Sequence, residues 1–276
     1  MAAIGLALGA SLTWGFADFF GPLQGRVLGV LRALIYVQLG GLVGIALIVA
    51  VRGKGLEDST ALLAVPAAVS GTLGLFAYYR GIAVGAISIV APIAGISAIV
   101  PVIVGIASGD RPSEWQLLGI ACALIGVFLA AREPGRTGAR LAAGVGLAML
   151  AAVGFGGYFP FMHASGNADF WWASLIFRTT STSVILAVVA VQRPSLGVPG
   201  RVLGWLALIG FGDMFGNLLF AASSASGLVS ITSVLASLYP IVTVVLARIV
   251  LAERVGRSQE AGIGLTLAGV ALISAG

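Results

Sequence analysis

The sequence alternates between long apolar runs and short polar connections. A helix needs about 20 mostly apolar residues to cross the hydrocarbon core of a bilayer, and ten such runs follow one another along the 276 residues. They cover residues 2–22, 28–51, 61–79, 83–107, 114–131, 141–163, 170–191, 201–221, 228–250 and 259–275. Segments of about ten residues with alternating polarity, typical of transmembrane β-strands, are absent. The pattern predicts an all-α, polytopic membrane protein with ten transmembrane helices.

Composition excludes several classes of soluble protein. Hydrophobic residues make up 59% of the chain and charged residues only 9%, whereas soluble globular proteins carry about 25% charged residues. The 40 glycines and 10 prolines stand among aliphatic residues and Phe, unlike those of disordered chains. We therefore expect an integral membrane protein, placed in a bacterial inner membrane, with residues 1–22 as a retained first span.

The net charge of +5 does not indicate nucleic-acid binding, because the basic residues are spread mostly singly rather than in runs of about five or six. The distribution of Lys and Arg among the connections between spans instead indicates the orientation of the protein in the membrane. The odd-numbered connections hold nine, Arg26, Arg80, Arg132, Arg136, Arg140, Arg193, Arg201, Arg254 and Arg257, and the even-numbered ones hold Arg52, Lys54 and Arg111. By the positive-inside rule, this count places the odd connections in the cytoplasm and both termini outside.

Two parts of the chain carry the same spaced motif. In residues 110–126 an acid–Arg pair is followed by Gln six residues after the acid, Gly three residues later and Gly seven later. Residues 253–269 repeat this order at an offset of 143. Upstream, the Gly-Ala-Ile-Ser segment at 85–88 pairs with Gly-Leu-Val-Ser at 227–230. These matches indicate an internal duplication.

The duplicated units are expected to be residues 1–136 and 137–276, together forming one integral membrane unit. Each contains five predicted spans, an odd number, so the second unit enters the membrane from the opposite face. Inverted repeats of this kind occur in transporters, where they expose a site near the bilayer midplane to each side in turn. The duplication therefore favours a carrier over a purely structural membrane protein.

A Pro-bearing span followed by this motif is similar to the EamA-type ten-helix carriers of the drug/metabolite transporter superfamily. In the second half the pattern consists of Pro240, Glu253, Arg254, Gln259, Gly262 and Gly269. The first half departs from it, because Asp110 replaces Glu and Pro101 lies nine residues before the acid, where Pro240 lies thirteen before. The resemblance covers nearly the whole chain and extends to amino-acid exporters of the YddG type. It implies cytoplasmic termini, opposite to the charge count, and a central cavity lined by spans one, three, four, six, eight and nine.

Charged side chains at membrane depth cost several kcal/mol each, so they indicate function or pairing. Asp213 lies near the middle of the eighth predicted span, and Asn217 shares its face one turn later. This pair could bind a substrate amine, a proton or an arginine. Arg178 in the seventh span could hold a substrate carboxylate or pair with Asp213. Asp18 shares a face with Trp14 and is a candidate for charge coupling, although it stands near the end of its predicted span, where it could be merely solvated.

Aromatic residues on the cavity-lining spans form a second set. Together with Asp213 and Asn217, the predicted substrate-binding residues are Trp14, Tyr78, Tyr79, Tyr158 and Tyr239. An amphipathic cavity with a few charges suits a zwitterionic amino acid, whereas the alternative for each ring is packing or an interfacial belt. His163, at the end of span six, is interpreted as a wetted loop residue, with a proton sensor as the alternative.

Prolines within the spans are candidate hinges, because each removes a backbone hydrogen bond and bends its helix. They are Pro92, Pro101, Pro160 and Pro240. The alternative is a static kink. Gly-x3-Gly pairs such as Gly212 and Gly216 let helices approach closely, and we interpret them as packing within a monomer rather than as a dimer interface.

These patterns predict a secondary transporter that exports amino acids, aromatic ones among them, or related small metabolites by alternating access. A carrier for drugs or nucleotide sugars is the alternative within transport, but large anions would need several Lys or Arg in the cavity. A membrane enzyme is disfavoured, because one histidine and few buried carboxylates make a metal site improbable. We therefore expect no catalytic residue, no metal ion and no cofactor.

Overall fold

The computed structural model describes residues 2–84, 87–130, 139–251 and 256–275, and every regular element among them is a helix. The elements are α1 (Ala2–Leu28), α2 (Val30–Arg52), η1 (Ser59–Leu63), α3 (Ala64–Val84), α4 (Ile87–Gly95), η2 (Ile96–Ala98), α5 (Ile99–Ala107), α6 (Glu114–Ala130), α7 (Ala139–Gln192), α8 (Gly200–Ser224), α9 (Val229–Ala236), α10 (Tyr239–Leu251) and α11 (Arg257–Ala275). Within the described ranges, six helical stretches are long and apolar enough to span a membrane, and three shorter apolar helices accompany them. The prediction of an all-α membrane protein is confirmed.

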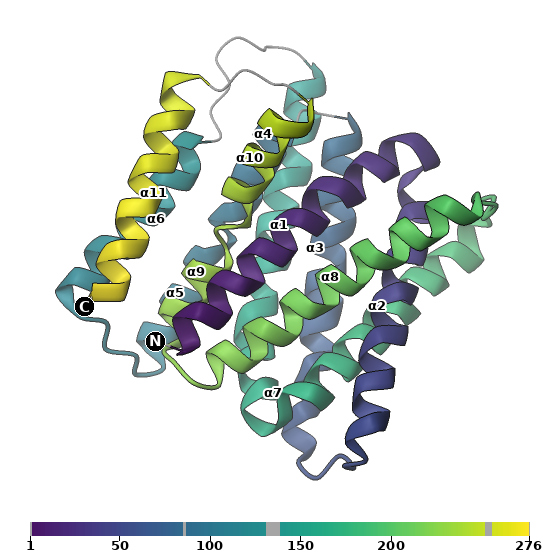
Figure 1. Cartoon of the computed structure of the whole chain (residues 1–276), viewed down its shortest axis with the longest axis horizontal. Coiled ribbons are helices and arrows are strands. Elements are labelled where there is room, and N and C mark those ends of the chain that lie inside the picture. The colour runs from purple at the N-terminus through teal and green to yellow at the C-terminus, as the bar shows by residue number, and fades with distance from the viewer. Residues whose placement is uncertain (1, 85–86, 131–138, 252–255, 276) are drawn as a thin grey trace.

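The long helix α7 consists of two arms that meet at Asp169. The backbone there is extended (φ −158°, ψ 107°), and the Asp169 carboxylate accepts hydrogen bonds from the N–H groups of Trp171 (2.8 Å) and Trp172 (3.2 Å). A carboxylate that caps the first N–H groups in this way starts a new helix. The connection predicted at 164–169 therefore shrinks to a single extended residue, about which the chain turns (Figure 1).

Two helices run further than the apolar pattern predicts. α1 continues through Pro22 to Leu28, and α3 continues through residues 80–81 to Val84, so the ends predicted for these two spans at residues 22 and 79 are wrong. Helical backbone can extend into the interfacial layer, where polar side chains find partners. The Arg26 guanidinium does so by donating from Nε (3.0 Å) and Nη2 (2.9 Å) to the carbonyl of Ile82.

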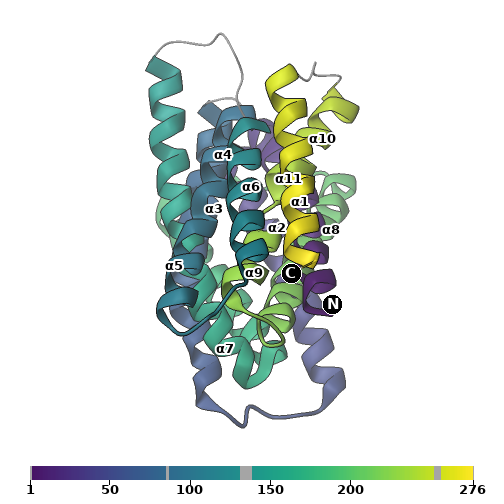
Figure 2. The same ribbon diagram turned by 90° about the vertical axis from the view of Figure 1, so that its left-hand side faces the viewer.

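The two halves of the chain interleave instead of forming separate lobes. α1 and α2 pack on α8, α3 packs on α7, and α6 packs on α11. Each of these contacts joins an element before residue 131 to one after residue 138. The α6–α11 pair stands at the left flank of the bundle in Figure 1 and faces the viewer in Figure 2, and the two chain ends lie near each other in both views.

Glycines of the repeated motif meet in the α6–α11 contact. A Cβ atom at Gly119 would lie 2.7 Å from the carbonyl oxygen of Gly269, and one at Gly269 would lie 2.6 Å from the carbonyl oxygen of Gly119. A Cβ at Gly126 would lie 2.7 Å from the Gly262 oxygen. The duplicated glycines thus bring two backbones together across the halves.

Replacing Gly269 with valine is expected to destabilise the bundle. The new side chain would overlap backbone of α6, and overpacking of this kind lowers the free energy of unfolding by about 1–3 kcal/mol. Gly264→Val, on the same helix, is the matched control, because nothing lies within 4 Å of a Cβ at Gly264. Thermal unfolding of the purified protein in detergent compares the two. Equal midpoints would show that α6 and α11 do not pack as described.

Two interrupted helices touch near their breaks. η2 separates α4 from α5, and residues 237–238 separate α9 from α10. A Cβ at Gly95, which precedes η2, would lie 3.0 Å from Cγ of Pro240, which follows the second break. Interrupted helices that meet inside a membrane protein are typical of transporters.

The candidate hinge prolines lie at different kinds of position. Pro240 is the second residue of α10, and Pro101 is close to the start of α5, so both adjoin the breaks. Pro160 lies inside the first arm of α7. Pro92 falls within α4, but its side chain lies outside the described residues. The hinge role stays a prediction for all four.

Candidate substrate cavity

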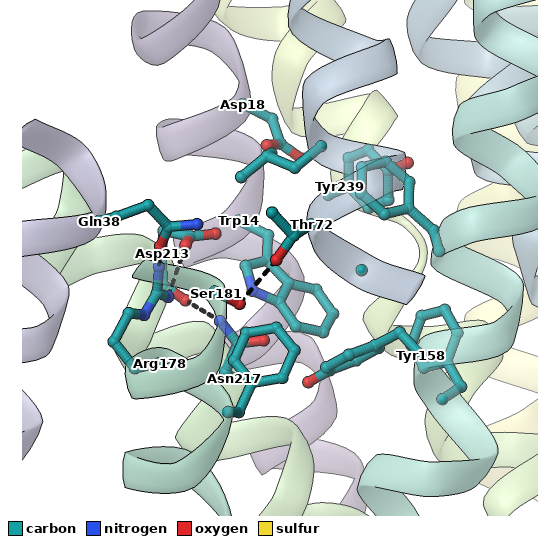
Figure 3. A pocket seen from close by; sticks show the side chains of 15 residues that line it. Trp14, Asp18, Gln38, Thr72, Tyr158, Arg178, Ser181, Asp213, Asn217 and Tyr239 are labelled. Atoms are coloured by element: carbon teal, nitrogen blue, oxygen red, sulfur yellow. Dashed lines mark hydrogen bonds and ion pairs between the residues drawn. The ribbon is translucent and has the colours of Figure 1, made fainter. Parts of the chain in front are cut away.

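A cavity lies about half-way along α1, α2, α3, α7 and α8, where the start of α10 also reaches it (Figure 3). The space in it that admits the centre of a water molecule amounts to about 60 Å³, which is room for a few waters or one small solute. Its walls consist of Trp14, Asp18, Gln38, Gly71, Thr72, Leu75, Phe155, Tyr158, Phe159, Phe177, Arg178, Ser181, Asp213, Asn217 and Tyr239. They come from both halves of the chain.

Arg178 is the centre of a buried polar network. Its side chain is 1% exposed, and Nη2 donates to Oδ2 of Asp213 at 2.6 Å. Nη1 donates to Oε1 of Gln38 on α2. The backbone of α2 comes this close at Gly41, where a Cβ would lie 2.7 Å from the backbone oxygen of Gly210 and 3.0 Å from Nε of Arg178. The predicted alternative in which Arg178 pairs with Asp213 is confirmed, and the network ties α2, α7 and α8 together.

Asn217 supports the same network from one turn further along α8. Its Nδ2 donates to the backbone carbonyl of Asp213 at 2.8 Å, while both residues also line the cavity (Figure 3). Nearby, Thr72 of α3 donates to Ser181 of α7 at 2.8 Å. The polar wall therefore consists of two separately hydrogen-bonded groups, the Arg178 network and the Thr72–Ser181 pair, which together come from four helices.

Aromatic rings form the opposite wall. Trp14 and Tyr158 meet edge to face with ring centroids 5.9 Å apart, and Phe177 approaches Tyr158 at 5.2 Å in the same manner. Aromatic pairs favour this geometry. The hydroxyl oxygens of Tyr158 and Tyr239 are buried and have no partner among the described residues. The wall therefore combines apolar area with free hydrogen-bonding groups.

Asp18 is deeper than the apolar pattern predicts. Because α1 continues to Leu28, Asp18 lies well inside the helix rather than near its end, and it is 6% exposed. It lines the cavity one turn after Trp14 (Figure 3). The alternative of a merely solvated carboxylate is therefore wrong.

Comparison with known sequence families identifies the family of this chain. The sequence model of the EamA-like transporter family matches residues 1–132 and, a second time, residues 142–275. The chain belongs to this family. The predicted membrane transporter of the drug/metabolite superfamily, with two repeats, is thereby confirmed. No curated protein matches its sequence.

The fold of this EamA-like transporter also occurs among solved structures, of which 26 chains match. One of them, described only as "Crystal structure of protein", aligns with a TM-score of 0.78 at 18% sequence identity. The alignment covers 99% of this chain and 98% of that chain. At this identity the likeness shows the fold alone.

Three predicted site residues of the transporter lie outside the cavity wall. Tyr78 is fully buried, with a hydroxyl that has no described partner, and Tyr79 packs its hydroxyl beside Gly21 of α1. His163 is helical and half-buried in the first arm of α7, with Nε2 3.3 Å from Nδ2 of Asn167. The interpretation of His163 as a loop residue is therefore wrong, because the helix continues to Asp169.

Several cavity residues of the transporter do not stand out in the sequence as site residues. Gln38 is a long polar side chain in the otherwise apolar second span, and a polar residue at membrane depth is a usable signal. Thr72 and Ser181 gave no such signal, because single hydroxyls are common in membrane helices. Phe155, Phe159 and Phe177 resemble ordinary packing residues in sequence. Apart from Gln38, these residues are recognised as cavity residues only from the tertiary structure, which brings their side chains to the same cavity wall.

Proposed function

We propose that the protein is a secondary carrier that exports amino acids, aromatic ones among them, or related small metabolites by alternating access through the midplane cavity. The observation that carries this proposal is the buried cavity itself, which combines an aromatic wall, an Arg178–Asp213 ion pair and the separate carboxylate of Asp18. Buried ionisable groups around a small space inside a transporter mark a substrate or ion path.

The chemistry of the wall suits a zwitterion. The Asp18 carboxylate would take the ammonium group, and the hydroxyls of Tyr158 and Tyr239 would donate to the carboxylate. Trp14 and the neighbouring phenylalanines would enclose the side chain. A nucleotide sugar would instead need several free cations, whereas the guanidinium of Arg178 is already engaged by Asp213 and Gln38. The small volume also favours a small solute over a bulky drug.

The proposed membrane topology has ten spans. Counting the two arms of α7 separately, and joining α4 to α5 and α9 to α10 across their breaks, assigns five spans to each family match. The second five then run opposite to the first, which gives the inverted repeat that alternating access uses. We propose that the carrier works as a monomer, because the residues of a single chain form the cavity. We further propose that it resides in a bacterial inner membrane.

Counterflow in proteoliposomes tests the function. Liposomes loaded with unlabelled phenylalanine are diluted into labelled phenylalanine, and a panel of other amino acids, nucleosides and nucleotide sugars is run in parallel. We expect labelled phenylalanine to accumulate several-fold above the level in protein-free liposomes. Accumulation of nucleotide sugars alone would favour the alternative substrate class. If no solute moves under any condition, the carrier proposal fails.

A further inference from the structure

The cavity holds more acids than bases. Its wall contains the carboxylates of Asp18 and Asp213 but only the one guanidinium of Arg178. That guanidinium donates to Asp213 at 2.6 Å and also to Gln38. Asp213 is therefore compensated where it stands, and Asp18 is left as the uncompensated acid of the cavity.

Asp18 has no partner in the part of the chain that the structure describes. It is 6% exposed and makes no hydrogen bond or ion pair with any described residue. The titratable groups within electrostatic range of it are Asp213 on α8, Tyr78 and Tyr79 on α3, and Tyr239 on α10. α2 contributes only the neutral Gln38 to the wall, and Arg178 of α7 is engaged by Asp213. None of these groups offers Asp18 a positive charge.

An isolated carboxylate in such surroundings is costly, because it loses its hydration without gaining a counter-charge. The low-energy states of Asp18 are therefore the protonated acid and the carboxylate paired with a cation. We propose that Asp18 carries a proton in the empty carrier and exchanges it for the ammonium group of the substrate. This inference rests on the proposed function, since it takes the cavity as the transport site.

The exchange is balanced in atoms and charge. The O–H bond of the Asp18 carboxyl breaks, both electrons of that bond stay on the carboxylate oxygen, and the proton leaves to water. The substrate ammonium keeps its three N–H bonds and becomes the counter-charge. On the other side of the membrane the amine departs and a proton takes its place. Each ammonium group carried one way therefore brings one proton the other way, which couples export to the pH gradient.

Proton release on binding tests this exchange directly. The purified full-length protein in lipid nanodiscs and weak buffer receives phenylalanine, phenethylamine or 3-phenylpropionate, while a pH indicator and calorimetry report protons released and ligand bound. The three probes share one phenyl frame and differ in whether they carry an ammonium, a carboxylate or both. We expect the two amines to release about one proton per molecule bound at acidic pH, and their affinity to fall by up to about tenfold per unit as the pH is lowered. 3-Phenylpropionate should release none.

Variants at one position separate charge from packing. Asp18→Asn is expected to abolish proton release and to weaken phenethylamine binding at least about tenfold without pH dependence, whereas Asp18→Glu should retain the release. Asp58→Asn, in an exposed connection, is the control and should behave as the wild type. If Asp18→Asn does not fold, the exchange is tested by the pH dependence of phenethylamine affinity in the wild type and in Asp18→Glu.

Two results would overturn the exchange while leaving the carrier proposal intact. One is amine binding by the wild type with no proton release anywhere between about pH 5 and 8. The other is wild-type affinity for phenethylamine in folded Asp18→Asn. If no probe binds and no solute moves in liposomes, the proposed function fails, and the exchange fails with it.

Discussion

Replacing Asp213 with asparagine is expected to lower the free energy of unfolding by about 3–5 kcal/mol. The guanidinium of Arg178 is 1% exposed and takes its counter-charge from Asp213 at 2.6 Å. Removing one partner of a buried ion pair leaves the other charge uncompensated, which is more damaging than removing both. Unfolding of the purified protein in mixed micelles, followed by tryptophan fluorescence or circular dichroism, measures the loss.

Two further variants show whether the charge itself is responsible. The double variant Asp213→Leu and Arg178→Met should recover part of the loss, because no charge stays behind, although Gln38 then loses its partner. Arg52→Gln is the control for an ion pair that water reaches. The Arg52 and Asp169 side chains are each 23% exposed, and pairs of this kind contribute about 0–1 kcal/mol. If Asp213→Asn is no more damaging than Arg52→Gln, the buried network does not hold α2, α7 and α8 together.

Replacing Gly216 with valine is expected to reduce transport at least about tenfold. A Cβ at this position would lie 2.5 Å from Cδ1 and 2.6 Å from Nε1 of Trp14, so the indole must move toward the space that it borders. Overpacking of about 1–3 kcal/mol at the wall of the cavity corresponds to a loss of roughly tenfold or more in affinity for a bound solute. Counterflow of labelled phenylalanine and direct binding measure the effect.

Gly212→Val is the matched control on the same helix. Nothing lies within 4 Å of a Cβ at Gly212, so this variant carries the same β-branched side chain without a contact to Trp14. It should transport as the wild type does. Equal transport by the two variants would show that Trp14 does not border the substrate path, and equal loss would show a general effect of valine on α8.

The periodic hydrophobic runs predicted the membrane location and the all-helical class, because apolar stretches of this length have few other stable forms. The ends of the helices were predicted less well. α1 and α3 pass through polar residues that a hydropathy pattern takes as connections. These ends depend on local partners, such as the Ile82 carbonyl for Arg26, and not on the polarity of the residues alone.

The candidate site was predicted in part. Trp14, Asp18, Tyr158, Arg178, Asp213, Asn217 and Tyr239 all line the cavity, whereas Tyr78, Tyr79 and His163 do not. Tyr78 and Tyr79 are neighbours on α3, and neither lines the cavity, because the rotation of α3 in the bundle turns Thr72 and Leu75 toward it instead. This rotation is set by close contacts at glycines, for example Gly74 against Gly154.

Hydropathy and spacing alone are enough to define a duplicated helical membrane protein with a few charged residues inside its spans. Hydrophobicity and motif spacing are properties of the linear sequence, so they do not depend on how the helices are arranged in the tertiary structure. Which acid neutralises Arg178 is a different kind of fact. Asp18 and Asp213 are both acids on membrane helices. Because α8 packs beside α2 and α7, the Arg178 guanidinium pairs with Asp213, and Asp18 lines the cavity without a described counter-charge.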